Sequence, residues 1–216
     1  MHKVVTVDME RDLLAENRRI ANENRTLLEK NGVVAFDFLG GIGSGKTLII
    51  EKLVEALKAK GKRCAAIAGD VSGDDDYQRF VRHGIPAANV NTGKECHLDA
   101  HLVDHALEDL PIEDLDYVFV ENVGNLVCPV DFPLGSQKRV VVISVTEGDD
   151  MVRKHPPIFA FSDVIVINKV DLAEAMEVDP KILERDARRI NPGARVIFMD
   201  TRRGKGLDEL MDALEI

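Results

Sequence analysis

The chain has 216 residues, 45% of them hydrophobic and 31% charged, which is the composition of an ordinary globular protein with a sizeable core. Its formal net charge of −10 argues against nucleic acid or an anionic membrane as a partner, because both select a basic surface. No apolar run is long enough to span a membrane, the N-terminus does not resemble a secretory signal, and three cysteines cannot build a disulfide framework, so we expect a cytoplasmic protein.

Residues 1–31 are predicted to form a helical extension of the main domain, which comprises residues 32–216. The valines at positions 4, 5 and 7 favour a short extended segment, after which Asp8 is a candidate N-cap and Asn31-Gly32 ends the helix. Apolar residues recur every seven positions along this helix, at Leu13, Ile20 and Leu27, with Leu14, Ala21 and Leu28 beside them. The stripe favours packing on the chain's own main domain over a coil between two subunits.

A phosphate-binding pattern follows the first predicted strand. An apolar run at residues 33–39 predicts a buried strand, and residues 48–57 have the periodicity of a helix. Between them, Gly40–Thr47 matches G-x-x-x-x-G-K-[ST]. In this strand–loop–helix context we predict a nucleotide site rather than a glycine-rich turn without a ligand.

Each residue type in this loop suits a triphosphate. Glycines let backbone N–H groups point at phosphate oxygens, and the helix that starts near Lys46 adds the positive end of its dipole. We predict that Lys46 reaches the β- and γ-phosphates and that the Thr47 hydroxyl is a ligand of Mg²⁺. The predicted nucleotide-binding residues of the loop are Gly41, Gly43, Ser44, Gly45, Lys46 and Thr47.

From residue 32 onward, strand and helix patterns alternate. This alternation predicts an α/β fold of the P-loop NTPase type, with a mostly parallel, doubly wound sheet. Further strands are expected at residues 63–68, 117–120, 140–145, 163–167 and 195–199, with residues 85–90 as a loop or short strand. Helices are expected near residues 77–83, 95–110 and 180–190, and from Leu207 onward.

A base-reading motif, Asn168-Lys169-Val170-Asp171, follows the strand at 163–167. The Asp171 carboxylate can accept hydrogen bonds from N1–H and the exocyclic amino group of guanine, which adenine cannot offer in that geometry. Lys169 can cover the purine face, and Asn168 can tie this loop to the phosphate loop. Thr201 and Arg202, after the last strand, are placed to close over the base, so GTP is the expected nucleotide.

Carboxylates are expected beside the phosphates. Asp70 and Glu121 each follow a strand whose carboxyl end should face the phosphate loop, so we assign them to Mg²⁺ and, with Lys46, to catalysis. The acidic run at residues 74–76 is more typical of a solvated loop. Asn125 stands where a water-orienting glutamine would be sought, so we expect slow intrinsic GTP hydrolysis.

Thiols and imidazoles form a third group. Cys96-His97 is predicted to open a helix, and Cys128 follows a later strand. These side chains are ligands for Zn²⁺ and Ni²⁺. His101 and His105 follow at intervals of four, so they would share a helix face with His97 and could supply outer ligands. The residues alone leave open a buried Cys128 and solvated histidines.

With these motifs in place, residues 30–216 resemble the HypB family, the GTPases of nickel–iron hydrogenase maturation. Besides the two nucleotide motifs, the stretches that carry the resemblance are Gly69–Val71, Thr92–Ala100 and Glu121–Pro129. The resemblance implies that Cys96, His97 and Cys128 line a nickel or zinc site at the interface of a homodimer that forms on GTP binding. It also implies delivery of nickel to the hydrogenase large-subunit precursor, alongside a small maturation chaperone.

The expected mechanism couples these two sites. Glu121–Gly124 would respond to the γ-phosphate and Cys128 follows on the same segment, so GTP binding would order the metal site and hydrolysis would release it. One feature departs from the resemblance: residues 1–31 contain no cysteine and only His2, so tight nickel storage is not expected.

Other functions stay open. One is a related metallocentre GTPase, for urease or a cobalamin-dependent mutase, and another is a metal reservoir with a vestigial nucleotide site. An ATPase of the ParA or nitrogenase-reductase type is disfavoured, since Gly40-Gly41 occupies the region of its extra lysine. A small-molecule kinase would need an acceptor site or lid, and none is recognisable.

Overall fold

A computed structural model describes residues 2–216, with side chains described from residue 11 onward. Its seven strands form one parallel sheet in the order β3-β2-β4-β1-β5-β6-β7. The strands are β1 Val34–Gly40, β2 Cys64–Asp70, β3 Ala87–Asn91, β4 Tyr117–Glu121, β5 Lys138–Ser144, β6 Val164–Asn168 and β7 Arg195–Phe198. The predicted parallel, doubly wound α/β fold is therefore confirmed.

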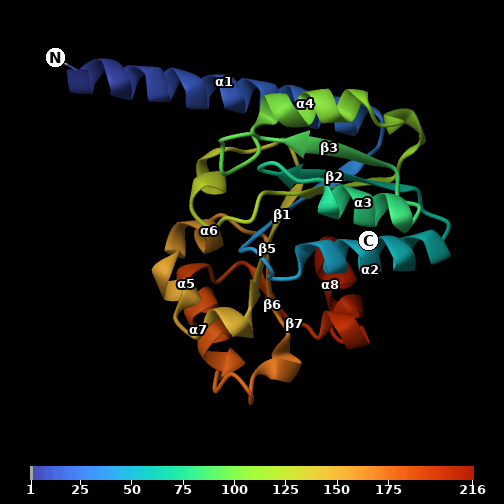
Figure 1. The fold of residues 1–216 in the computed structure, drawn as a ribbon, viewed down its shortest axis with the longest axis vertical. Helices are drawn as coiled ribbons and strands as arrows, with labels where there is room; N and C mark the ends of the chain where they lie inside the picture. The colour runs from blue at the N-terminus through green and yellow to red at the C-terminus, as the bar shows by residue number, and fades with distance from the viewer. Residues whose placement is uncertain (1) are drawn as a thin grey trace.

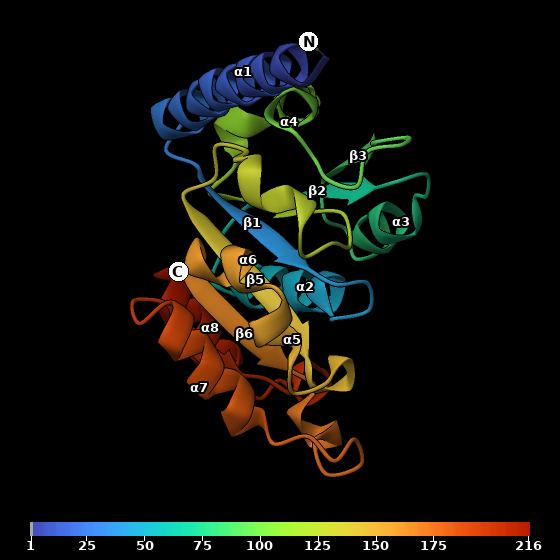
Figure 2. The same ribbon diagram turned by 90° about the vertical axis from the view of Figure 1, so that its left-hand side faces the viewer.

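Helices cover both faces of this sheet (Figures 1 and 2). On one face lie α2 Lys46–Ala59, α3 Asp75–Arg82 and α8 Leu207–Leu214; on the other lie α1 His2–Lys30, α4 Ala100–Glu108, α5 Met151–Lys154, α6 Pro156–Ala160 and α7 Pro180–Ile190. The strands are buried on both faces because successive side chains point to opposite layers. In β1, Phe36 and Phe38 pack towards α2, whereas Ala35 packs towards α1 and α4.

The N-terminal helix differs from the prediction in its start and agrees with it in part of its buried face. α1 runs from His2 through the three valines expected to be extended, because β-branched residues lower helix propensity only slightly. Of the predicted stripe, Ala21 and Leu28 are buried, whereas Leu13 is 60% exposed. Two polar residues, Asn17 and Asn24, are buried on the same helix. Asn17 and Asn24 bond the two backbone groups of Ala100, at 2.8 Å each, so α1 is anchored on the start of α4 (Figure 1).

Two other elements differ from the prediction. The helix expected from residue 95 begins at Ala100, because the Asp99 side chain accepts a hydrogen bond from the Leu102 amide at 2.8 Å and caps it there. Short helices α5 and α6 fill the connection between β5 and β6, where no helix was predicted. None of the helices in residues 2–216 combines the length and apolar character needed to cross a bilayer.

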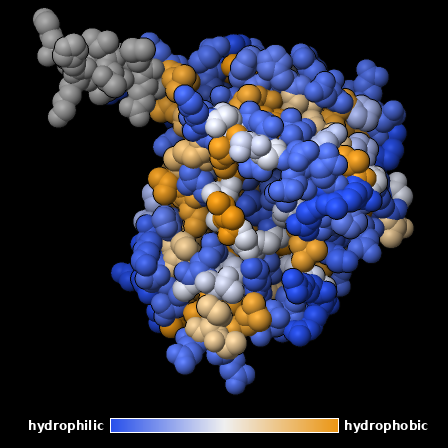
Figure 3. Space-filling model, viewed as in Figure 1, coloured by the Kyte–Doolittle hydropathy of each residue, from blue (hydrophilic) through white to orange (hydrophobic). Residues whose placement is uncertain are grey.

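The fold places the predicted motifs together. In a parallel sheet the carboxyl ends of the strands meet at one edge, and the loops after β1, β2, β4 and β6 leave from that edge. On the face shown in Figure 3, hydrophilic residues predominate and hydrophobic residues form small patches. Two of the most exposed large hydrophobic residues, Ile42 and Val127, belong to loops at this edge.

Candidate nucleotide and metal site

The loop between β1 and α2 has the shape of an anion cradle. Lys46 Nζ lies 3.2 Å from the Gly40 carbonyl and 3.3 Å from the Gly41 carbonyl, so its side chain folds over the loop. Gly45 has a φ of 110°, and a Cβ there would stand 2.3 Å from Asn168 Nδ2, so only glycine fits. Ser44 Oγ is buried without a hydrogen-bond partner among the side chains described. An incoming phosphate oxygen suits this loop.

The predicted base-reading loop contacts the phosphate loop directly. Asn168 Nδ2 donates to the Ser44 carbonyl at 2.9 Å, and Lys169 Nζ donates to the Gly43 carbonyl at 2.6 Å. Thr201 Oγ1 donates to Asn168 Oδ1 at 2.7 Å, which fixes the orientation of that amide. The two loops therefore form one rigid unit.

A cavity of about 290 Å³ lies beside this unit. It is lined by Gly45, Leu48, Asn168, Lys169, Asp171, Leu172, Asp200, Thr201 and Arg202. The Asp171 carboxylate is 3.5 Å from Arg203 Nη1, and Arg203 also pairs with Asp200 at 2.8 Å. Three of these lining residues, Leu48, Leu172 and Asp200, were not predicted as site residues. Leu48 directly follows the phosphate loop, Leu172 directly follows the base-reading motif, and Asp200 directly follows the last predicted strand. These positions are the signal that could have found them.

A second cavity, of about 400 Å³, adjoins the first through the shared residues Gly45 and Leu48. Its lining includes Lys46, Thr47, Asp70, Asp76, Arg79 and Glu121. One cavity lies beside the predicted base-reading loop and the other is lined by the phosphate loop, an arrangement that suits the two halves of a nucleoside triphosphate. Asp70 lies at the rim, where its carboxylate accepts from the Val71 amide at 2.6 Å.

Two carboxylates converge on Thr47. Its hydroxyl lies 2.8 Å from Asp76 Oδ1 and 2.9 Å from Glu121 Oε1, but it has one proton and donates to one of them at a time. Burial raises the pKa of Glu121 to about 7, although Lys46, 4.0 Å away, opposes the shift. Glu121 Oε2 is buried and unpaired in the part of the chain with described side chains. This set of oxygens fits Mg²⁺, which Thr47, Glu121 and Asp76 could hold.

Asp76 is the residue of this site that sequence reasoning undervalued. The acidic run at residues 74–76 was expected to be a solvated loop, but α3 begins at Asp75 and carries Asp76 towards Thr47. The available signal was the spacing of three residues between Asp76 and Arg79, which puts an acid and a base on one helix face.

Cys96, His97 and Cys128 lie together. One ligand atom from each falls within 4.8 Å of the others, and Cys96 Sγ is 3.9 Å from His97 Nδ1. The hydrogen bond to Cys128 is the main cause that raises the pKa of Cys96, because two adjacent thiols resist ionisation without a cation. Burial lowers the pKa of His97, which favours the neutral imidazole that binds metals. Three soft ligands leave a fourth position open on a tetrahedral ion.

The other two histidines are separate from this cluster. Because α4 begins at Ala100, His97 lies in the preceding loop and does not share a helix face with His101 and His105, contrary to the prediction. His101 and His105 instead pair with each other, with their Nε2 atoms 3.3 Å apart.

The segment after β4 connects the two sites. Asn122 Oδ1 accepts from the Leu98 amide at 3.1 Å, and Asn125 Nδ2 donates to the Cys96 carbonyl at 3.1 Å. Asn125 also pairs with Gly40 in an isolated antiparallel bridge. A Cβ on Gly124 would stand 2.4 Å from Ile42 Cγ1, so this segment rests on the phosphate loop.

Comparisons with known proteins identify the family of the chain. The family model "CobW/HypB/UreG, nucleotide-binding domain" matches residues 35–198. A probable hydrogenase maturation factor HypB of Methanocaldococcus jannaschii is 55% identical over 215 residues, which cover 100% of this chain and 97% of the relative. The HypB of Escherichia coli K12 is 38% identical over 209 residues, covering 97% of this chain and 72% of the relative.

Two solved structures are also similar. HypB from Archaeoglobus fulgidus aligns with a TM-score of 0.86 at 51% identity, covering 93% of this chain and 98% of that one. HypB from Helicobacter pylori in complex with nickel aligns with a TM-score of 0.87 at 31% identity, covering 93% and 94%. The chain belongs to the HypB family of hydrogenase maturation factors, within the wider CobW/HypB/UreG group of nucleotide-binding domains.

Proposed function

We propose that this protein binds GTP with Mg²⁺, hydrolyses it slowly to GDP and phosphate, and uses that cycle to control nickel at Cys96, His97 and Cys128. The cluster would accept Ni²⁺, with Zn²⁺ as the alternative ion, and release it towards the hydrogenase large-subunit precursor. The nickel complex of the Helicobacter pylori relative supports the choice of metal.

The base pocket supports guanine. Asp171 lines the cavity beside Asn168 and Lys169, and both of these are already bonded to the phosphate loop. A purine that entered would meet the Asp171 carboxylate with N1–H and the amino group of guanine, whereas adenine would leave that charge without donors. Thr201 and Arg202 line the same cavity and would close it from the other side.

The phosphate side supports hydrolysis at a low intrinsic rate. Lys46 would contact the β- and γ-phosphates. Thr47, Glu121 and Asp76 would hold Mg²⁺, and Asp70 at the rim would hold it through water. Mg²⁺, when bound, neutralises charge on the phosphate oxygens. Asn125, the candidate to orient water, uses its amide on the Cys96 carbonyl and its oxygen on the Val127 amide, at 2.8 Å for the latter. Its engagement there supports slow hydrolysis.

The observation that carries the proposal is this double attachment of Asn125. Its backbone pairs with Gly40 of the phosphate loop, and its side chain bonds both segments that supply the thiols. A γ-phosphate that moves Gly124 or Gly40 would therefore move Asn125, and with it Cys96 and Cys128. By linkage, the metal would alter nucleotide affinity by the same coupling energy.

A nucleotide-dependent homodimer is the state that would complete the metal site. Ile42 is 88% exposed on the phosphate loop, and Val127 is 61% exposed next to Cys128, so both loops present hydrophobic side chains that a second copy could cover. The three ligands of one chain leave room for a ligand from that copy. Cys64, Cys96 and Cys128 are free thiols, which suits the reducing cytoplasm, where a small maturation chaperone would be the further partner.

The test is the oligomeric state with GDP and with a non-hydrolysable GTP analogue, each with and without Ni²⁺, by analytical ultracentrifugation. We expect the dimer fraction to rise with the GTP analogue and to rise further with Ni²⁺. Identical distributions in the four conditions, with nucleotide shown to be bound, would overturn the proposal.

A further inference from the structure

An arginine of α3 reaches the phosphate cavity. Arg79 lines the cavity that contains Lys46 and Thr47, although its helix follows the acidic loop rather than any nucleotide motif. Among the residues that line this cavity, Lys46 and Arg79 are the two cations, facing the carboxylates Asp70, Asp76 and Glu121.

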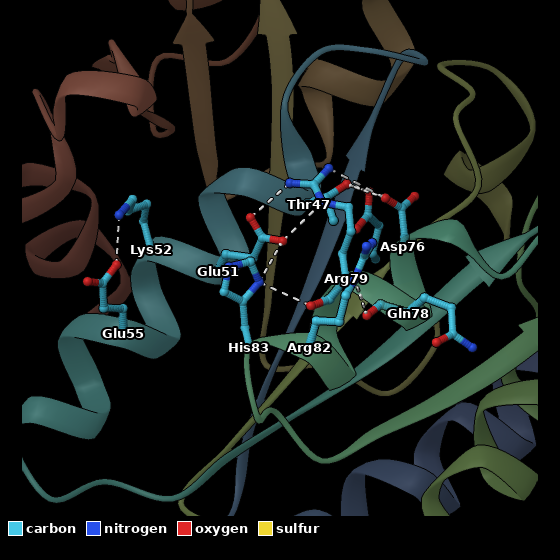
Figure 4. Close-up of polar contacts among 10 residues, drawn as sticks. Thr47, Glu51, Lys52, Glu55, Asp76, Gln78, Arg79, Arg82 and His83 are labelled. Atoms are coloured by element: carbon cyan, nitrogen blue, oxygen red, sulfur yellow. Dashed lines mark hydrogen bonds and ion pairs between the residues drawn. The ribbon is translucent and has the colours of Figure 1, made fainter.

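Arg79 is held from behind by a buried carboxylate (Figure 4). Its Nε donates to Glu51 Oε1 at 3.0 Å and its Nη2 donates to Glu51 Oε2 at 2.8 Å, a two-point fork. The Glu51 side chain is 6% exposed and lies one helical turn after Thr47 on α2. His83 Nδ1, 3.2 Å from Glu51 Oε1, completes the set of groups on this carboxylate.

The remaining nitrogen faces the reacting end of the cavity. Arg79 Nη1 takes no part in the fork and lies 3.9 Å from Asp76 Oδ1, beyond hydrogen-bond distance. The same Asp76 oxygen is 2.8 Å from the Thr47 hydroxyl. The guanidinium therefore stands next to the hydroxyl that would ligate Mg²⁺ at the terminal phosphates, with N–H groups available there.

We propose that Arg79 contacts the terminal phosphate and stabilises the charge that develops during GTP hydrolysis, with Glu51 as its positioning residue. This inference rests on the proposed GTPase activity. In that reaction a water oxygen bonds to the γ-phosphorus, and the bond from γ-phosphorus to the bridging oxygen breaks with its electron pair left on GDP. Of the two water protons, one stays on the incoming oxygen and the other moves to another oxygen of the released phosphate. Arg79 donates hydrogen bonds throughout and transfers no proton.

The ion pair by itself would be a poor stabilising device, because burying Glu51 costs about as much as the pairing returns. A planar guanidinium can bind Glu51 with two N–H groups and still present other N–H groups to a phosphate, which a lysine could not reproduce. This difference makes Arg79→Lys informative: it keeps a cation beside Glu51, so the fold is retained, but it loses the free Nη1.

The experiment measures single-turnover GTP hydrolysis by the full chain at saturating Mg²⁺ and at protein concentrations where the rate per chain is constant. We expect Arg79→Ala and Arg79→Lys to slow the step by on the order of 10²–10³-fold. Glu51→Gln should slow it by about tenfold, because the neutral amide still accepts from Arg79. Arg82→Ala, three residues along the same helix and bonded to the Gln78 carbonyl, is the matched control and should change little.

A second readout separates catalysis from support of the fold. Arg79→Lys should lose affinity for GDP with aluminium fluoride, a transition-state mimic, but keep its affinity for GDP alone. A purely structural role would weaken both complexes together and would overturn the inference, as would hydrolysis by Arg79→Lys at the wild-type rate. Absence of GTP hydrolysis by the wild-type chain would instead defeat the proposed function.

Discussion

The predicted guanine pocket and the Cys–His cluster are held in place by different kinds of contact. In the pocket, Asn168 and Lys169 bond directly to carbonyls of the phosphate loop. In the cluster, the loop that carries Cys96 and His97 is bonded by the side chains of Asn122 and Asn125, which lie after β4. The first arrangement is preorganised by direct bonds to the phosphate loop, whereas the second depends on a segment that itself rests on that loop. An adjustable geometry at the Cys–His cluster would suit the metal transfer that we propose.

We expect the largest effect from a substitution in the predicted guanine pocket. Asp171→Asn replaces an acceptor by a group that presents a donor, so guanine loses its partner and xanthine, which has a carbonyl in place of the amino group, gains one. We expect the preference for GTP over xanthosine triphosphate to reverse, with a total swing on the order of 10⁴-fold, measured by titration of fluorescent analogues. An unchanged preference would show that Asp171 does not read the base.

In the Cys–His cluster, Cys128→Ala should lower Ni²⁺ affinity by at least about a hundredfold. Loss of a direct ligand weakens metal binding more than loss of a residue that only bonds a ligand. Cys64→Ala is the matched control: Cys64 is buried in the sheet, and burial raises the pKa of its thiol to about 12, so it stays a neutral apolar residue. Competition titration with a chromophoric chelator measures both variants. Equal losses in the two would contradict the assignment of the site.

Between the two regions lies a buried acid, Asp37 of β1, whose Oδ1 accepts from Asn122 Nδ2 at 3.2 Å. Burial raises its pKa from 3.8 to about 6 in the folded chain, against the pull of Arg139. Between these pH values the folded chain keeps a proton that the unfolded chain releases. The free energy of unfolding should therefore fall as pH rises from about 4 to about 6, and the loss should persist above that range.

Asp37→Asn should remove this fall and gain about 3 kcal/mol relative to wild type across the window, measured by urea unfolding at each pH. Asp12→Asn, at an exposed position of α1, is the control and should run parallel to wild type. A parallel profile for Asp37→Asn as well would mean that Arg139 and Asn122 compensate the buried charge fully.

A smaller effect is expected at Asn125, which connects the phosphate loop to the Cys–His cluster. Asn125→Ala removes both side-chain bonds, and we expect it to reduce the influence of nucleotide on Ni²⁺ affinity by about 1–2 kcal/mol with little effect on GTP affinity. Asn125→Asp keeps the acceptor for the Val127 amide but loses the donor to the Cys96 carbonyl. If Asn125→Asp behaves as wild type, the bond to Cys96 carries none of the coupling.

The parts of the molecule that could be predicted are those whose signal is local. Gly40–Thr47 and Asn168–Asp171 combine a strand, a turn and a residue pattern within a dozen positions, and the structure has a strand before each of them. The predicted start of α4 was wrong because the cap formed by Asp99 outweighs the apolar pattern that precedes it. Contacts such as Asn122 with Asp37, 85 positions apart, depend on the sheet register, which no local pattern encodes.

The central claim is that nucleotide state and metal binding are coupled through the segment after β4. The most direct test is the Ni²⁺ dissociation constant of the wild-type chain saturated with GDP and with a non-hydrolysable GTP analogue. We expect the two dissociation constants to differ by roughly 5–150-fold. Equal constants, with both nucleotides bound, would contradict it.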